Sequence, residues 1–146
     1  MPSYEASAVT NASAEAAWTA WTDVEGWSAF DHIESAHLDG TFRPGALITS
    51  KAKGFPSSSL TVTRVEQPSL WTDESRSPGM QMTFDHVVEP GEEGTRLTER
   101  VRISGPLGRA LGPLMRRKLE ALFAASVAAV ARQAEAAEAQ AQPPSS

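Results

Sequence analysis

The stretch that decides the fold is Gly94-Thr-Arg-Leu-Thr-Glu-Arg-Val-Arg-Ile103, followed by a Gly105–Pro106 break and a long apolar-faced segment ending near Glu138. The first part alternates as a strand does, and the last part has the periodicity of one long helix. A small domain that ends in such a helix must cover its apolar face with something large. A curved antiparallel sheet is the natural partner, and a ligand cavity can remain between the two layers.

One stripe of side chains recurs at spacings of three and four after Pro106, which predicts a helix with a single apolar face. The stripe consists of Leu111, Leu114, Met115, Leu119, Leu122, Phe123, Ser126, Val127 and Val130. Pro113 lies inside this pattern, so we expect it to mark the true start of the helix or a kink. We expect residues 1–138 to form one ligand-binding domain and residues 139–146 to form a disordered tail.

The chain before the final strand has the pattern of an antiparallel meander, with Gly or Pro breaks about every ten residues. We expect strands near Ile33–Leu38, Ala46–Lys53, Ser59–Glu66, Leu70–Ser75, Met80–Glu89 and Thr95–Ser104. A first strand is expected near Ser3–Val9, then a helix over Ala14–Thr22 capped by Asn11 or Ser13, and a short helical turn near Trp27–Phe30. The predicted fold class is α+β: a curved antiparallel sheet of about seven strands wrapped around a long C-terminal helix, with two short helices after the first strand.

Composition argues against several classes of function. The 146 residues include 13 Lys and Arg against 18 Asp and Glu, a net charge of −5, so we expect no binding of nucleic acid or of anionic membranes. The chain has no cysteine, and therefore no disulfide and no thiolate nucleophile. No signal peptide and no membrane span is visible, so we expect a cytoplasmic protein. No dinucleotide or phosphate-loop motif is present, and we expect no cofactor.

Alternation decides which side chains of the last two strands face the predicted cavity. On Met80–Glu89 the more apolar face carries Met82, Phe84, His86 and Val88. On Thr95–Ser104 the inner face must be Leu97, Glu99, Val101 and Ile103, because the other face carries three arginines that cannot line a core cheaply. Each strand thus places one ionisable group, His86 or Glu99, on an otherwise apolar inner face.

The hairpin between these strands brings the two ionisable groups together. If Val88 pairs with Leu97, then His86 lies opposite Glu99, with Cβ atoms about 5 Å apart. Such a pair in a cavity could act as a general acid and base, because burial raises the pKa of a carboxyl group. The same pair could equally be a structural hydrogen bond that satisfies two buried polar groups.

Aromatic residues elsewhere in the chain are candidates for the core. We expect Trp18, Trp21, Trp27 and Phe30 to be core residues, although one of them could line the mouth of the cavity. Trp71 lies on a strand whose orientation the sequence leaves open. Their bulk supplies the volume that a single core of this size needs.

Charged residues in the middle of the chain offer no clear site. Lys51 is most simply placed on a solvated outer face. Asp31, His32 and Glu34 lack the fixed spacing of a metal site, so we expect no bound metal. No Gly-x-Ser-x-Gly elbow is present to position a nucleophilic serine.

Short segments along nearly the whole chain carry a resemblance to a known superfamily. They are Ala14-Glu-Ala-Ala-Trp18, Asp23-Val-Glu-Gly-Trp27, Asp39-Gly-Thr-Phe-Arg-Pro-Gly45, Val65-Glu-Gln-Pro68, Phe84-Asp-His86, Gly94-Thr-Arg-Leu-Thr98 and Ser104-Gly-Pro-Leu107. With the expected order of elements, the chain resembles the helix-grip (START-like, SRPBCC) superfamily and, within it, the bacterial polyketide cyclase/dehydrase-like group. The resemblance implies a cavity between the concave sheet and the long helix, open to small apolar or aromatic ligands.

Three functions remain open at this stage. We favour binding of a small apolar or aromatic ligand, polyketide-like or lipid-like, by a monomer or homodimer. From alternation and helical phase, the lining should be Met82, Phe84, Val88, Leu97, Val101, Met115, Leu119, Leu122 and Phe123, together with His86 and Glu99. One alternative is a cyclase/aromatase or dehydratase-like enzyme that uses His86 and Glu99 as acid and base. The other is a protein-interaction module with a filled core and no cavity.

Overall fold

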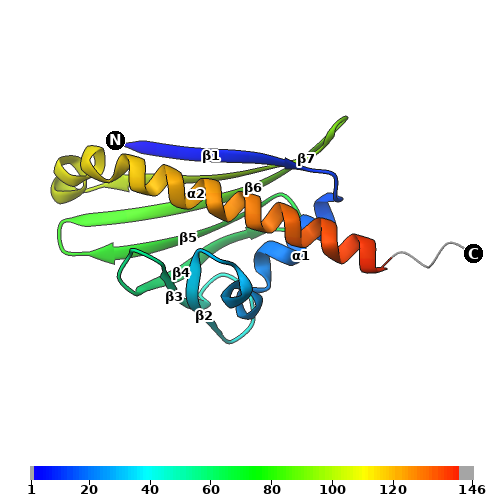
Figure 1. The fold of residues 1–146 in the computed structure, drawn as a ribbon. Helices are drawn as coiled ribbons and strands as arrows, with labels where there is room; N and C mark the ends of the chain where they lie inside the picture. The colour runs from blue at the N-terminus through cyan, green and yellow to red at the C-terminus, as the bar shows by residue number, and fades with distance from the viewer. Residues whose placement is uncertain (1, 142–146) are drawn as a thin grey trace, which may run out of the picture.

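The computed structural model describes residues 2–141 (Figure 1). The elements follow the order that the sequence predicts. They are β1 (Ser3–Thr10), α1 (Ala14–Thr22), the 3₁₀ helix η1 (Val24–Ala29), β2 (Ile33–Asp39), β3 (Leu47–Ala52), β4 (Ser58–Glu66), β5 (Leu70–Ser77), β6 (Met80–Gly91), β7 (Gly94–Ser104) and α2 (Pro106–Ala141).

The seven strands found within residues 2–141 form one antiparallel sheet in the order β1-β7-β6-β5-β4-β3-β2. Strands β2 to β7 follow one another as a meander, and β1 closes the order by pairing with β7. The long helix α2, coloured yellow to red in Figure 1, lies across the inner face of the curved sheet and contacts β1, β6 and β7. The predicted helix-grip architecture is confirmed.

The long helix starts earlier and ends later than its sequence pattern indicates. It begins at Pro106, where the fixed φ of proline suits a first helical turn, and not at Pro113. Pro113 is tolerated inside the helix because it and Arg109 are exposed, so that the carbonyl left without a partner can be hydrated. The helix continues to Ala141, so 139–141 are helical; the rest of the predicted tail, 142–146, lies outside the described residues.

Two groups of buried side chains hold the helix on the sheet. The larger group, around α1, includes Trp18, Trp21, Val24, Ile48, Val62, Trp71, Val88, Leu97, Val127 and Val130. The smaller group, under the first half of α2, is Val101, Ile103, Leu119 and Phe123. Ser13 caps α1, with its side-chain oxygen accepting the N–H of Ala16 at 3.1 Å. The pocket described below is bordered by residues of both groups.

Two tight hairpins set the register of the central strands. Ser77 pairs with Met80 across the β5–β6 turn, and Gly91 pairs with Gly94 across the β6–β7 turn. The predicted pairs, Val88 with Leu97 and His86 with Glu99, follow directly and are confirmed. Gly94 has a φ of +123°, and a Cβ atom there would overlap the carbonyl oxygen of Thr10.

This close approach makes Gly94 sensitive to any side chain. We expect Gly94→Ala to lower the free energy of unfolding by roughly 3 kcal/mol, because it combines a disfavoured φ with a clash against backbone. Gly40 is a matched control, since its φ is +88° and nothing lies within 4 Å of a Cβ there. Gly40→Ala should cost only about 1 kcal/mol, the conformational part alone. Urea unfolding of both variants checks this, and equal losses would contradict it.

Candidate functional site

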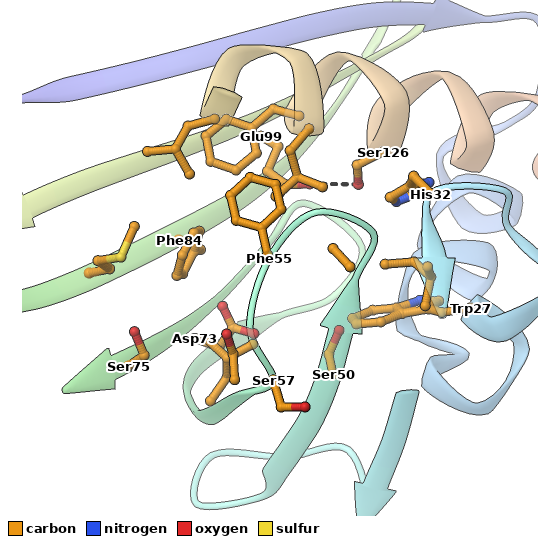
Figure 2. Close-up of a pocket in the computed structure, with 18 of the residues that line it drawn as sticks. Trp27, His32, Ser50, Phe55, Ser57, Asp73, Ser75, Phe84, Glu99 and Ser126 are labelled. Carbon is orange, nitrogen blue, oxygen red and sulfur yellow. Dashed lines mark hydrogen bonds between the residues drawn. The ribbon is translucent and has the colours of Figure 1, made fainter. Parts of the chain in front are cut away.

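A pocket of about 500 Å³ lies between the inner face of the sheet and α2 (Figure 2). Its floor comes from β2 to β7, and one wall comes from α2. The α1–η1 region adds Trp21, Trp27 and Phe30, and the connection between β3 and β4 adds Phe55. Eight of the residues predicted for the site line it: Met82, Phe84, His86, Glu99, Met115, Leu119, Leu122 and Phe123.

Three predicted ligand-binding residues do not line the pocket. Val88 and Leu97 are buried in the core around α1, and Val101 is buried beneath α2. Alternation placed them on the inner face, where they are, but it does not say which part of that face the helices cover. The described helices pack directly on these three positions and leave the pocket elsewhere along the strands.

His86 is held firmly as a neutral side chain. Its ring stacks on that of Trp71 with centroids 3.5 Å apart, and the Trp21 ring packs perpendicular to it with centroids 5.2 Å apart. Its Nδ1 lies 3.1 Å from the carbonyl oxygen of Trp71; since a carbonyl only accepts, Nδ1 carries the proton and Nε2 is the acceptor. Burial lowers the pKa of His86 from 6.5 to about 3, so the imidazolium does not form near neutral pH.

Glu99 is the second ionisable group of the predicted pair. It is buried and accepts a hydrogen bond from the Ser126 hydroxyl on α2 at 2.7 Å, the dashed line in Figure 2. Burial raises its pKa from 4.5 to about 7, against the opposing effect of the Ser126 hydrogen bond. Within residues 2–141, no hydrogen bond joins Glu99 to His86: each has its own partner. His86 and Glu99 are therefore neighbours in the sheet, but each is held by a different partner.

Asp73 is a pocket residue that the sequence analysis missed. Only 2% of it is exposed, and within residues 2–141 its Oδ1 has no hydrogen-bond partner. Figure 2 shows its carboxyl group directed from β5 into the pocket. Burial, and then the charge of Glu99, raise the pKa of Asp73 well above its ordinary value. A signal was available: counting back from the Pro78–Gly79 turn places Asp73 opposite Phe84, on the inner face.

The pocket is closed on one side by the segment between β3 and β4. Phe55 and Ser57 of this segment line it, as Figure 2 shows. Lys118 of α2 donates a hydrogen bond to the Gly54 carbonyl at 2.6 Å and lies 4.9 Å from the centre of the Phe55 ring. The hydrogen bond and the attraction between the Lys118 ammonium and the Phe55 ring hold the segment against the long helix.

The aromatic residues and Lys51, which the sequence analysis also considered, lie in the core, along the pocket or outside it. Trp18 is core, whereas Trp21, Trp27 and Phe30 also line the pocket. Trp71 is fully buried behind His86. Lys51 pairs with Glu34 at 2.9 Å in a partly exposed position, away from the pocket.

Residues 2–141 hold neither a metal-binding cluster nor a helix that could span a membrane. In that range no three His, Asp or Glu side chains are grouped so that they could hold a metal ion. No helix there has both the length and the apolar character needed to cross a bilayer.

The raised pKa of Glu99 predicts a pH-dependent contribution to stability. Below pH 4.5 the Glu99 carboxyl is protonated in both the folded and the unfolded protein. Between pH 4.5 and about 7 only the folded protein keeps the proton. The free energy of unfolding therefore falls as pH rises through this range. We expect Glu99→Gln to remove this loss, so that its advantage over wild type grows by about 3 kcal/mol from acid to neutral pH. Urea unfolding across this range measures it. The exposed Glu89→Gln variant is the control, and a Glu99→Gln comparison that stays flat across this pH range would contradict the assignment.

Comparison with known proteins supports the same architecture. Residues 1–135 match the family described as polyketide cyclase/dehydrase and lipid transport. Norcoclaurine synthase from Thalictrum flavum is similar in structure, with a TM-score of 0.74, 14% identity, and coverage of 93% of this chain and 95% of that one. A protein of Thermus thermophilus gives a TM-score of 0.73 at 16% identity, over 93% of this chain and 99% of that one.

A third similar structure is the di-domain ARO/CYC StfQ from the steffimycin biosynthetic pathway. Its TM-score is 0.76 at 12% identity, and the match covers 94% of this chain but 52% of StfQ. No curated protein sequence gives a significant match. The structural likenesses, all at low identity, show the shared fold, whereas the family match spans most of the sequence. The chain therefore belongs to the polyketide cyclase/dehydrase and lipid transport family.

Proposed function

We propose that the protein binds a small, mostly apolar or aromatic molecule in the pocket beneath α2. The observation that carries this proposal is a pocket of about 500 Å³ with aliphatic and aromatic side chains on most of its walls. Binding sites for small molecules in proteins typically measure about 300–1,000 Å³ and combine such walls with a few polar groups. Asp73, His86 and Glu99 are the buried ionisable groups among the polar side chains of this lining.

The family match supports the same class of ligand. Its description names polyketide cyclases, dehydrases and lipid transport, and lipids are largely apolar molecules. The alternative function, a protein-interaction module, predicts a filled core without a cavity. The pocket of about 500 Å³ therefore argues against that alternative.

The binding proposal is tested by filling the pocket. Ser75 lies on the inner face of β5 and lines the pocket, so a phenyl ring in its place would occupy ligand space. We expect wild type to bind the neutral naphthalene dye prodan saturably, and Ser75→Phe to weaken this binding by about 10-fold or more. Ser3→Phe places the same ring at an exposed position on β1 and should leave affinity unchanged. Fluorescence titration measures both, and equal affinities would place the dye outside this pocket.

A second function, proton transfer, is favoured by one observation. Glu99 lines the pocket with a pKa of about 7, a value at which a carboxyl group can both accept and donate protons near neutral pH. Its carboxylate would take a proton from a carbon beside a ligand carbonyl and return it to the product. His86 stays neutral and would contribute only the acceptor Nε2, so the acid and base work falls to Glu99.

Exchange of the α-protons of β-tetralone in deuterated water tests this second function without knowledge of the natural substrate. We expect wild type to accelerate the exchange and Glu99→Gln to lower the acceleration by about 100-fold. Prodan affinity should change little, which separates lost chemistry from lost binding. Glu89→Gln, exposed at the end of β6, is the control. Equal exchange rates in Glu99→Gln and wild type would contradict the proton-transfer function and leave ligand binding as the proposed function.

A further inference from the structure

We propose that the pocket selects ligands that carry a protonated amine on an apolar or aromatic body, with Asp73 as the anion that holds the amine. This inference rests on the proposed binding function and assigns the chemical class of its ligand.

Asp73 is buried, and one of its two carboxyl oxygens lacks the partner that a buried carboxyl group requires. Its exposed fraction is 2%, and within residues 2–141 its Oδ1 accepts no hydrogen bond and no Lys or Arg forms an ion pair with it. A buried carboxylate without a partner is costly, so proteins normally pair it or leave it out. Here it faces the pocket, where a ligand can supply what the protein does not (Figure 2).

The opposite face of the same sheet holds a buried carboxylate that does have hydrogen-bond partners and countercharges. Asp85, on β6, is also buried, but it accepts hydrogen bonds from Thr72 at 2.9 Å and from Arg100 and Arg102 at 3.2 Å. These partners outweigh burial and lower the pKa of Asp85. Asp73 lies one strand away on the inner face with none of them. The missing countercharge is therefore specific to the pocket.

The remaining walls favour a cation and disfavour an anion. Glu99 is a second buried carboxyl group facing the same space. Trp27, Phe30 and Phe55 offer aromatic rings, whose faces attract cations. Arg76, the one Arg that lines the pocket within residues 2–141, is largely exposed and already pairs with Glu74 at 3.1 Å. His32 also lines the pocket, but burial lowers its pKa, which disfavours its cationic form. A ligand carboxylate would therefore meet two carboxyl groups and, within residues 2–141, no buried Lys or Arg, so apolar acids such as fatty acids should bind weakly.

Three probes with one naphthalene body separate the head groups: naphthylmethylamine, naphthylmethanol and naphthoate. We measure their affinities for wild type, Asp73→Asn and the exposed control Asp39→Asn by isothermal titration calorimetry at neutral pH. We expect wild type to bind the amine about 10-fold more tightly than the alcohol and the acid more weakly than either. Asp73→Asn should bring the amine to the level of the alcohol, while Asp39→Asn should behave as wild type.

Each outcome decides the question. An amine preference in wild type that Asp73→Asn abolishes supports the inference, and the wild-type ratio stands even if that variant folds poorly. Alcohol and amine bound equally, or an amine preference that survives in folded Asp73→Asn, overturns the inference and leaves the binding function intact. Failure of all three probes and of prodan to bind overturns both.

Discussion

The pocket depends on the register of three strands joined by two tight turns. The β5–β6 turn pairs Ser77 with Met80, and the β6–β7 turn pairs Gly91 with Gly94. As a consequence Trp71, His86 and Glu99 form one row across the inner face. A slip of one residue would send the whole row to solvent, because side chains alternate between faces. Without that register the chain would have a similar sheet but no ionisable groups beneath α2.

The buried ionisable groups of the pocket differ in how they affect the stability of the fold. Neutral His86 is satisfied by the Trp71 carbonyl and by stacking, and it adds rigidity to the pocket wall. The two carboxyl groups are different: burial raises the pKa of both, so the empty pocket favours their protonated forms. A group that costs stability in this way is more often found at functional sites than in structural cores. The outer-face carboxylate, Asp85, shows that the same sheet can hold a fully compensated acid.

Much of the fold followed from sequence patterns, and the site followed only in part. The strands, the two short helices and the long helix were predicted in order, and so was the position of His86 opposite Glu99. Period-two and helical patterns are local, so they survive in the sequence. Pro113 was predicted to mark the start of the long helix or a kink, and the start is wrong, because an exposed position inside the helix tolerates a proline. Asp73 was missed because β5 was not oriented, although the Pro78–Gly79 turn contained the needed register.

The sequence by itself determined the helix-grip architecture, the inner faces of β6 and β7, and the pairing of His86 with Glu99. Only the tertiary structure decided which inner-face residues meet the pocket and which lie under a helix, as Val88, Leu97 and Val101 do. It also decided the partners: Ser126 for Glu99, the Trp71 carbonyl for His86, and none within residues 2–141 for the Oδ1 of Asp73. The physical reason is that alternation is a property of one strand, whereas burial, partners and pKa depend on what other elements place beside it.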